Sequence, residues 1–88
     1  MDTDNAVALG IRDYLSRNFL FNDDGFHYAD DVSFIETGII DSFGVVELVH
    51  FVEDEFGISV ADDELVPDNL DSVDKLSSFI IRKQRGGI

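Results

Sequence analysis

The strongest constraint on the fold is the stretch from Asp41 to Phe56, which reads DSFGVVELVHFVEDEF. Asp41 or Ser42 can cap the start of a helix there, and Gly57 suits its end. At about 100° per residue, the larger apolar side chains of this stretch fall on one stripe. The stripe consists of Val45, Leu48, Val49, Val52 and Phe56. We therefore predict an amphipathic helix whose apolar stripe faces the core.

Both ends of the chain carry the same helical period. The first helix is predicted from Val7, Ile11, Tyr14 and Leu15 and ends near Phe19. Asp71 or Ser72 can cap a last helix, which carries Val73, Leu76, Phe79 and Ile80. Residues 61–66 leave room for only one short helix, because Pro67 disfavours the helical conformation in the residue before it. Residues 84–88 are expected to be a frayed tail.

A long connection, residues 20–41, separates the first two predicted helices. It contains a turn at Asn22–Gly25, and loops of this length in compact domains are usually functional or anchored. Ser33 and Glu36 fit a capping box for one short turn. The expected apolar anchors are Phe34, Ile35, Ile39 and Ile40. The sequence thus predicts a single all-α domain over residues 1–88, a small antiparallel bundle of three longer helices and one short helix, with the long loop between helices one and two.

The chain is strongly acidic, with 19 Asp and Glu against 6 Lys and Arg and a net charge of −13. This charge opposes binding to nucleic acid and insertion into an anionic membrane. No Lys or Arg stands between Arg17 and Lys75, so we expect an uncompensated negative field that suits a basic partner. No signal peptide or membrane-spanning run is recognisable. The expected protein is a cytoplasmic monomer.

Few residues support catalysis by the chain itself. The absence of Cys excludes disulfides, thiolate metal sites and a cysteine nucleophile. His27 and His50 lack metal-binding spacing, and the acidic turn lacks the EF-hand pattern, so no metal is expected. Ser42 is outside a G-x-S-x-G elbow and has no His nearby in sequence to act as its base. We expect no enzyme activity; taken alone, Ser42 can simply cap a helix, a contribution of about 1 kcal/mol.

The side of the central helix opposite the apolar stripe has the composition of a docking surface. Phe43, Glu47, His50 and Asp54 lie there, with Val46 at the border. A small apolar anchor ringed by charges is typical of protein–protein recognition. One interpretation is therefore an acidic helical adaptor that binds partners without a prosthetic group.

A second interpretation comes from a family resemblance. GIIDSFGVVELVHFVEDEFGI, residues 38–58, resembles the acyl carrier protein family, in which a D-S-L-like motif opens the second helix. In that family the serine carries 4'-phosphopantetheine, and the matching residue here is Ser42. The resemblance implies that a phosphopantetheinyl transferase takes the group from coenzyme A and that acyl or aminoacyl intermediates are then carried as thioesters. Phe43 and Gly44 depart from the fatty-acid carriers and look closer to aminoacyl and D-alanyl carriers.

The resemblance also implies a face that meets partner enzymes. Its candidate residues are Asp41, Phe43, Val46, Glu47, His50, Glu53 and Asp54 along the second helix, with Asp62 and Asp63 on the short helix. The implied partners are the transferase, a ligase that loads the cargo, and downstream synthases or transferases with basic docking patches. The core side chains between the helices could shelter an apolar acyl chain.

Overall fold

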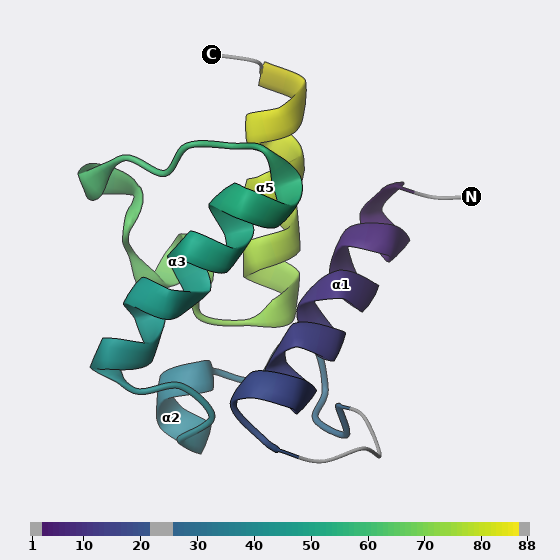
Figure 1. Cartoon of the computed structure of the whole chain (residues 1–88), viewed down its shortest axis with the longest axis vertical. Helices are drawn as coiled ribbons and strands as arrows, with labels where there is room; N and C mark the ends of the chain where they lie inside the picture. Colours follow the sequence, from purple (N-terminus) through teal and green to yellow (C-terminus); the bar gives the residue numbers. More distant parts are fainter. Residues whose placement is uncertain (1–2, 22–25, 87–88) are drawn as a thin grey trace.

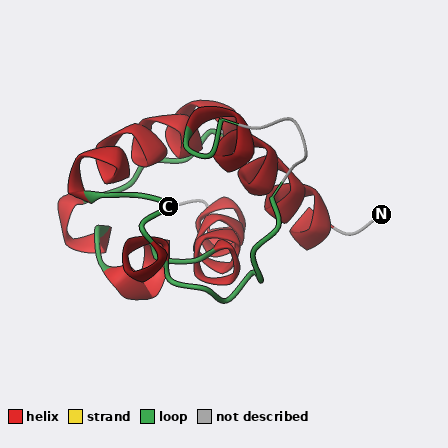
Figure 2. Cartoon of the chain, turned by 90° about the horizontal axis from the view of Figure 1, so that it is seen from below, coloured by secondary structure: helices red, strands yellow, loops and turns green. Residues whose placement is uncertain are grey.

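A computed structural model describes residues 3–21 and 26–86. Three long helices are present: α1 (Thr3–Asn18), α3 (Ser42–Phe56) and α5 (Val73–Gly86). The single turns α2 (Phe34–Thr37) and α4 (Pro67–Leu70) and the 3₁₀ turn η1 (Asp62–Glu64) lie in the connections (Figure 1). Figure 2 shows only helices and loops in the part of the chain that is described. The predicted all-helical bundle is confirmed.

The short elements differ in number from the prediction. Where one short helix was expected, η1 ends at Glu64 and α4 begins at Pro67. Proline is well suited to the first position of a helix, because the N–H group it lacks would have no partner there. Pro67 therefore starts a further helical turn as well as ending the previous segment.

The last helix begins where its cap was predicted. Ser72 Oγ accepts a hydrogen bond from the Lys75 N–H at 3.0 Å, so Ser72, not Asp71, caps α5. The helix continues to Gly86, which places residues 84–86 of the expected frayed tail in its last turn. Residues 87 and 88 lie outside the described part. Lys83 and Arg85 stand in the last turn, where positive charge is favourable.

The three long helices are arranged with α1 antiparallel to both α3 and α5 (Figure 1). α1 packs along α5, which also contacts α3 and α4. As Figure 1 shows, α1 begins and α5 ends at the upper end of the molecule, whereas α3 begins at the lower end. The first turn of α3 therefore lies far from both the start of α1 and the end of α5.

The core takes apolar side chains from all three long helices and from the connections. Its fully buried members include Ile11, Leu15, Phe34, Ile40, Leu48, Val52, Leu76 and Ile80. Of the predicted stripe on α3, Leu48 and Val52 are buried, whereas Val45, Val49 and Phe56 are only partly buried. The orientation of α3 is therefore confirmed, and the buried part of its stripe is narrower than predicted.

Aromatic side chains fill the space between α1 and α3. Tyr14 stacks on Phe51 with ring centroids 3.8 Å apart, and Phe19 and Phe56 extend the row with edge-on contacts. Such pairs contribute about 0.5–1.5 kcal/mol each beyond the area that they bury. The Tyr14 hydroxyl also donates a hydrogen bond to the Glu47 carbonyl oxygen at 3.3 Å. These contacts fix α3 against α1.

The long connection is tied to the start of α5 through α2. Ser33 Oγ accepts the Glu36 N–H at 3.1 Å, as the predicted cap requires, and donates to the Asp71 carboxylate. The Phe34 N–H reaches the Asp71 carbonyl oxygen at 2.8 Å. Phe34, Ile39 and Ile40 are buried as expected, but Ile35 is 51% exposed. The prediction for Ile35 was wrong because neighbouring side chains of one helical turn point in different directions. The predicted turn at residues 22–25 lies outside the described residues.

Basic side chains from the two ends of the chain fold back onto the acidic middle. Arg12 binds the Asp30 carboxylate with both its Nε, at 2.9 Å, and its Nη2. Lys83 Nζ lies 2.9 Å from Glu64 Oε1. The negative field is therefore partly compensated, contrary to the expectation from sequence. Glu47 and Asp54 on α3 form no ion pair among the side chains that the structure describes.

Candidate functional site

The start of α3 leaves the Ser42 hydroxyl free for chemistry. Asp41 is the N-cap, and its Oδ1 accepts the Gly44 N–H at 2.7 Å. Ser42 is the first residue of the helix and is exposed. No hydrogen bond within the described residues uses its hydroxyl. Of the two predicted caps, the structure therefore selects Asp41, and capping does not account for Ser42.

Gly44 lets the long connection pack against this first turn. A Cβ atom at position 44 would lie 2.8 Å from Phe19 Cε1 and 3.0 Å from Ile40 Cγ2, closer than carbon atoms normally approach. The small residue thus admits the Phe19 ring. This packing gives a structural reason for a Gly at position 44.

The predicted docking face is exposed. Phe43 is 85% exposed and Val46 is 57% exposed, and Glu47, His50 and Asp54 also face solvent. Asp41 lies at the start of this face, and Asp62 and Asp63 are exposed on η1. The structure therefore places the Phe43 ring next to Ser42 in the first turn of α3 and leaves carboxylates exposed along the helix and on η1.

Phe21 was missed by the sequence reasoning. It is 82% exposed, and with Phe43, Asp41 and Glu47 it lines a shallow hollow on the surface. Its backbone is left-handed, with φ of 53°, which is uncommon for a bulky residue. Nothing in the sequence indicates this exposure, because Phe is among the residue types that are most often buried.

Glu53 differs from the other predicted docking residues. Its Oε2 accepts the Val60 N–H at 2.9 Å, and the residue is only partly exposed. This carboxylate holds the loop that follows α3. It is therefore engaged in a structural contact, which no residue near it in sequence indicates.

An apolar pocket of about 220 Å³ opens beside Ser42. Its walls come from α2, α3, α4 and the segment between η1 and α4. The lining residues are Phe34, Ile35, Ile40, Ser42, Val45, Leu48, Leu65, Val66, Pro67, Leu70 and Asp71. Ser42 is both exposed and part of this lining, so the residue lies at the edge of the pocket.

Groups tied to other functions are sparse in the described residues. No three His, Asp or Glu side chains there converge so as to hold a metal ion. His27 and His50 are both exposed. Within the same residues, no helix combines the length and the apolar character needed to cross a membrane.

Comparison with protein families assigns the chain to a family. The chain matches the model of the family described as "Phosphopantetheine attachment site" over residues 10–80. A comparison with curated proteins returns no match. The matched range runs from α1 to α5 and includes the whole of α3.

The residues at the start of α3 fit the prosthetic group of this family, 4'-phosphopantetheine. The group needs a reachable hydroxyl and a place for a phosphodiester. Ser42 supplies an exposed hydroxyl, and the N–H groups of Ser42 and Phe43 have no partner within the described residues. Free N–H groups at a helix N-terminus favour a nearby anion, although the Asp41 carboxylate opposes this locally. The chain belongs to the phosphopantetheine attachment site family and is a carrier protein of the acyl carrier type.

Proposed function

We propose that this protein carries acyl or aminoacyl intermediates as thioesters on a 4'-phosphopantetheine group attached to Ser42, and presents them to partner enzymes. The observation that carries the proposal is the free, exposed Ser42 hydroxyl at the start of α3, beside an apolar pocket. Ser59 and Ser78 are also exposed, but neither stands at the start of a helix or lines this pocket. Ser16 and Ser72 are buried, and Ser33 is engaged with Asp71.

In the attachment step this chain supplies only the hydroxyl group that is modified. A phosphopantetheinyl transferase supplies the groups that activate the hydroxyl, so the absence of a neighbouring base at Ser42 is no obstacle. Asp41 holds the first turn through the Gly44 N–H, which keeps the Ser42 side chain at the helix start. When bound, the prosthetic group supplies a thiol for thioester formation. The polypeptide has no Cys that could compete with it.

The size of the pocket supports a short cargo. Its volume of about 220 Å³ is below the roughly 300–1,000 Å³ of sites that enclose drug-sized ligands. Its lining is apolar apart from Ser42 and Asp71, and the Asp71 carboxylate already accepts hydrogen bonds from Ser33 and the Ile35 N–H. A short acyl group suits these walls. An aminoacyl group would keep its charged amine at the mouth, in water.

The exposed side of α3 supports recognition by basic partners. Phe43 and Val46 offer apolar contacts, and Glu47, His50 and Asp54 surround them. Carboxylates that form no ion pair attract a basic surface toward Ser42, and they repel partners whose surface is acidic. The proposed partners are the transferase, a loading ligase, and downstream synthases or transferases with basic docking patches.

Mass spectrometry of the intact protein tests the proposal. After incubation with coenzyme A and a permissive phosphopantetheinyl transferase, the mass should rise by one phosphopantetheine group. Ser42→Ala should take no label, whereas the matched control Ser78→Ala, which removes an exposed hydroxyl on α5, should be labelled as wild type. Circular dichroism checks that both variants fold. Labelling of Ser42→Ala would contradict Ser42 as the attachment residue, and partner binding that persists in this variant without any prosthetic group would favour the adaptor interpretation.

A further inference from the structure

The outer wall of the pocket beside Ser42 belongs to the segment of residues 57–66 between α3 and α4. This segment makes few buried apolar contacts. Between Val52 and Leu70, a stretch that the structure describes throughout, no residue is buried. Ile58 and Val60 pack partly against the core, and the wall residues Leu65 and Val66 are 44% and 40% exposed. Elements with few buried apolar contacts open at low free-energy cost. Something other than the core must therefore hold this wall in place.

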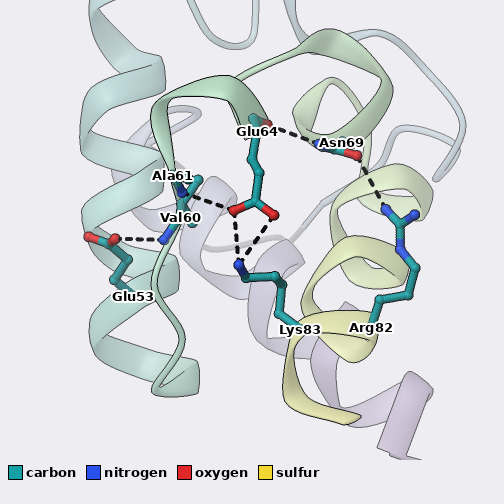
Figure 3. Close-up of polar contacts among 7 residues, drawn as sticks. All are labelled: Glu53, Val60, Ala61, Glu64, Asn69, Arg82 and Lys83. Carbon is teal, nitrogen blue, oxygen red and sulfur yellow. Dashed lines mark hydrogen bonds and ion pairs between the residues drawn. The ribbon is translucent and has the colours of Figure 1, made fainter. Parts of the chain in front are cut away.

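Polar contacts to α5 and α3 hold the segment (Figure 3). The Glu64 carboxylate accepts hydrogen bonds from the Ala61 N–H at 2.9 Å and from Lys83 Nζ at 2.9 and 3.2 Å. The Asn69 amide donates to the Glu64 carbonyl oxygen at 3.0 Å and accepts from Arg82 at 3.2 Å. Glu53 adds its contact with the Val60 N–H. Figure 3 shows Glu64 pointing from the segment toward Lys83 on α5.

Glu64–Lys83 is one of two well-shielded ion pairs in the described residues, and the other, Arg12–Asp30, lies away from the pocket wall. The Glu64 and Lys83 side chains are 28% and 21% exposed, whereas those of the Asp68–Lys75 pair are 95% and 49% exposed and lie 4.0 Å apart. Exposed ion pairs contribute little, since water screens them. The Ala61 N–H and Lys83 lower the pKa of the Glu64 carboxyl, which agrees with a carboxylate held by several donors.

We propose that the contact of Glu64 with Lys83, supported by Asn69 and Arg82, is a clasp that positions Leu65 and Val66 and thereby limits the length of acyl group that the pocket shelters. The inference rests on the proposed function, because it assigns a cargo preference to the same pocket. Glu64 and Lys83 touch no cargo and act as positioning residues. Without the clasp, the wall can move outward, and the pocket can take in more of a longer chain.

Thioester lifetime measures this preference. Wild type, Lys83→Met and Glu64→Gln are converted to the phosphopantetheine form and loaded with acetyl, hexanoyl or decanoyl groups, and hydrolysis is followed by mass spectrometry. Hydrolysis proceeds from the exposed state, so each methylene sheltered in the pocket slows it about fourfold. In wild type, lengthening the acyl chain should stop slowing hydrolysis at a shorter chain length than in Lys83→Met and Glu64→Gln. Lys75→Met, which removes the exposed pair, is the matched control and should follow wild type.

Hydrogen exchange separates the two possible failures, because it needs no prosthetic group. In the unmodified protein, Lys83→Met should speed exchange of the Leu65 and Val66 amides about two- to fivefold, the range that loss of one partly exposed ion pair supports. The α1 amides should keep their wild-type rates. Unchanged hydrogen exchange in Lys83→Met would overturn the clasp. Faster exchange combined with the wild-type dependence of thioester hydrolysis on chain length would overturn it as well. Failure of wild type to accept the prosthetic group would overturn the proposed function instead.

Discussion

Replacing Gly44 by alanine tests how closely Phe19 packs against the first turn of α3. Within a helix, alanine is about 1 kcal/mol more favourable than glycine. The added Cβ would, however, lie 2.8 Å from Phe19 Cε1 and 3.0 Å from Ile40 Cγ2, and crowding of this kind costs about 1–3 kcal/mol. Gly44→Ala should therefore lower the free energy of unfolding by about 0–2 kcal/mol.

The sign should change when the ring is removed. In a Phe19→Ala background, the closest contact disappears and the Ile40 side chain can shift into the space that the ring leaves, so Gly44→Ala should be stabilising by up to about 1 kcal/mol. Urea unfolding of the four proteins, followed by circular dichroism, gives the coupling energy, which we expect to be about 1–2 kcal/mol. Gly10→Ala is the control. Its Cβ would lie 3.5 Å from Phe56 Cζ, an ordinary contact, so this change should be stabilising in wild type. Additive effects at positions 19 and 44, within about 0.5 kcal/mol, would refute the packing argument.

Three further perturbations probe the core, the long connection and the docking face. Phe34→Ala should destabilise the fold by about 3–5 kcal/mol in urea unfolding, because the ring is 1% exposed; a loss below about 1 kcal/mol would contradict its place in the core. Arg12 lowers the pKa of the Asp30 carboxyl, mainly by hydrogen bonding. The pair therefore stabilises the folded state fully above the usual aspartate pKa. This stabilisation is lost as the pH falls through the lowered pKa. Arg12→Leu should therefore cost about 1 kcal/mol at neutral pH, and its difference from wild type should shrink below about pH 3.9; a constant difference across the acid range would argue against this linkage. Glu47→Lys combined with Asp54→Lys should weaken transferase association in a low-salt binding titration and leave helicity intact, and unchanged association would reject the acidic docking face.

Local signals in the sequence were enough to predict α3 and its orientation. The helical period, the cap at Asp41 and the Gly57 stop are all properties of neighbouring residues, and the structure contains each of them. The exposure of Phe43 followed from the same period. Ser42 could be singled out as a candidate because it lies at the start of the clearest helix. The family match supports the resemblance on which its proposed role depends.

Contacts between distant segments could not be predicted in this way. Glu64 and Lys83 are separated by 19 residues, and only the packing of α4 and η1 beside α5 brings them together. Glu53 looked like one more exposed carboxylate, because its bond to Val60 depends on the loop that turns back after Gly57. Phe21 was missed and Ile35 was wrongly expected to pack inward for a related reason. Their exposure is decided by the path of the chain, and apolar character alone does not reveal that path.

The opposite placement of the first turn of α3 and the outer ends of α1 and α5 has a practical consequence (Figure 1). An affinity tag, a fluorophore or a surface linker joined at either end of the helical framework would attach far from Ser42. Immobilised protein would thus present the proposed attachment residue to a soluble enzyme with an unobstructed approach. The kinetics of loading and transfer could then be measured on a surface. The first turn of α3 would face the solution whether the protein is attached through α1 or through α5.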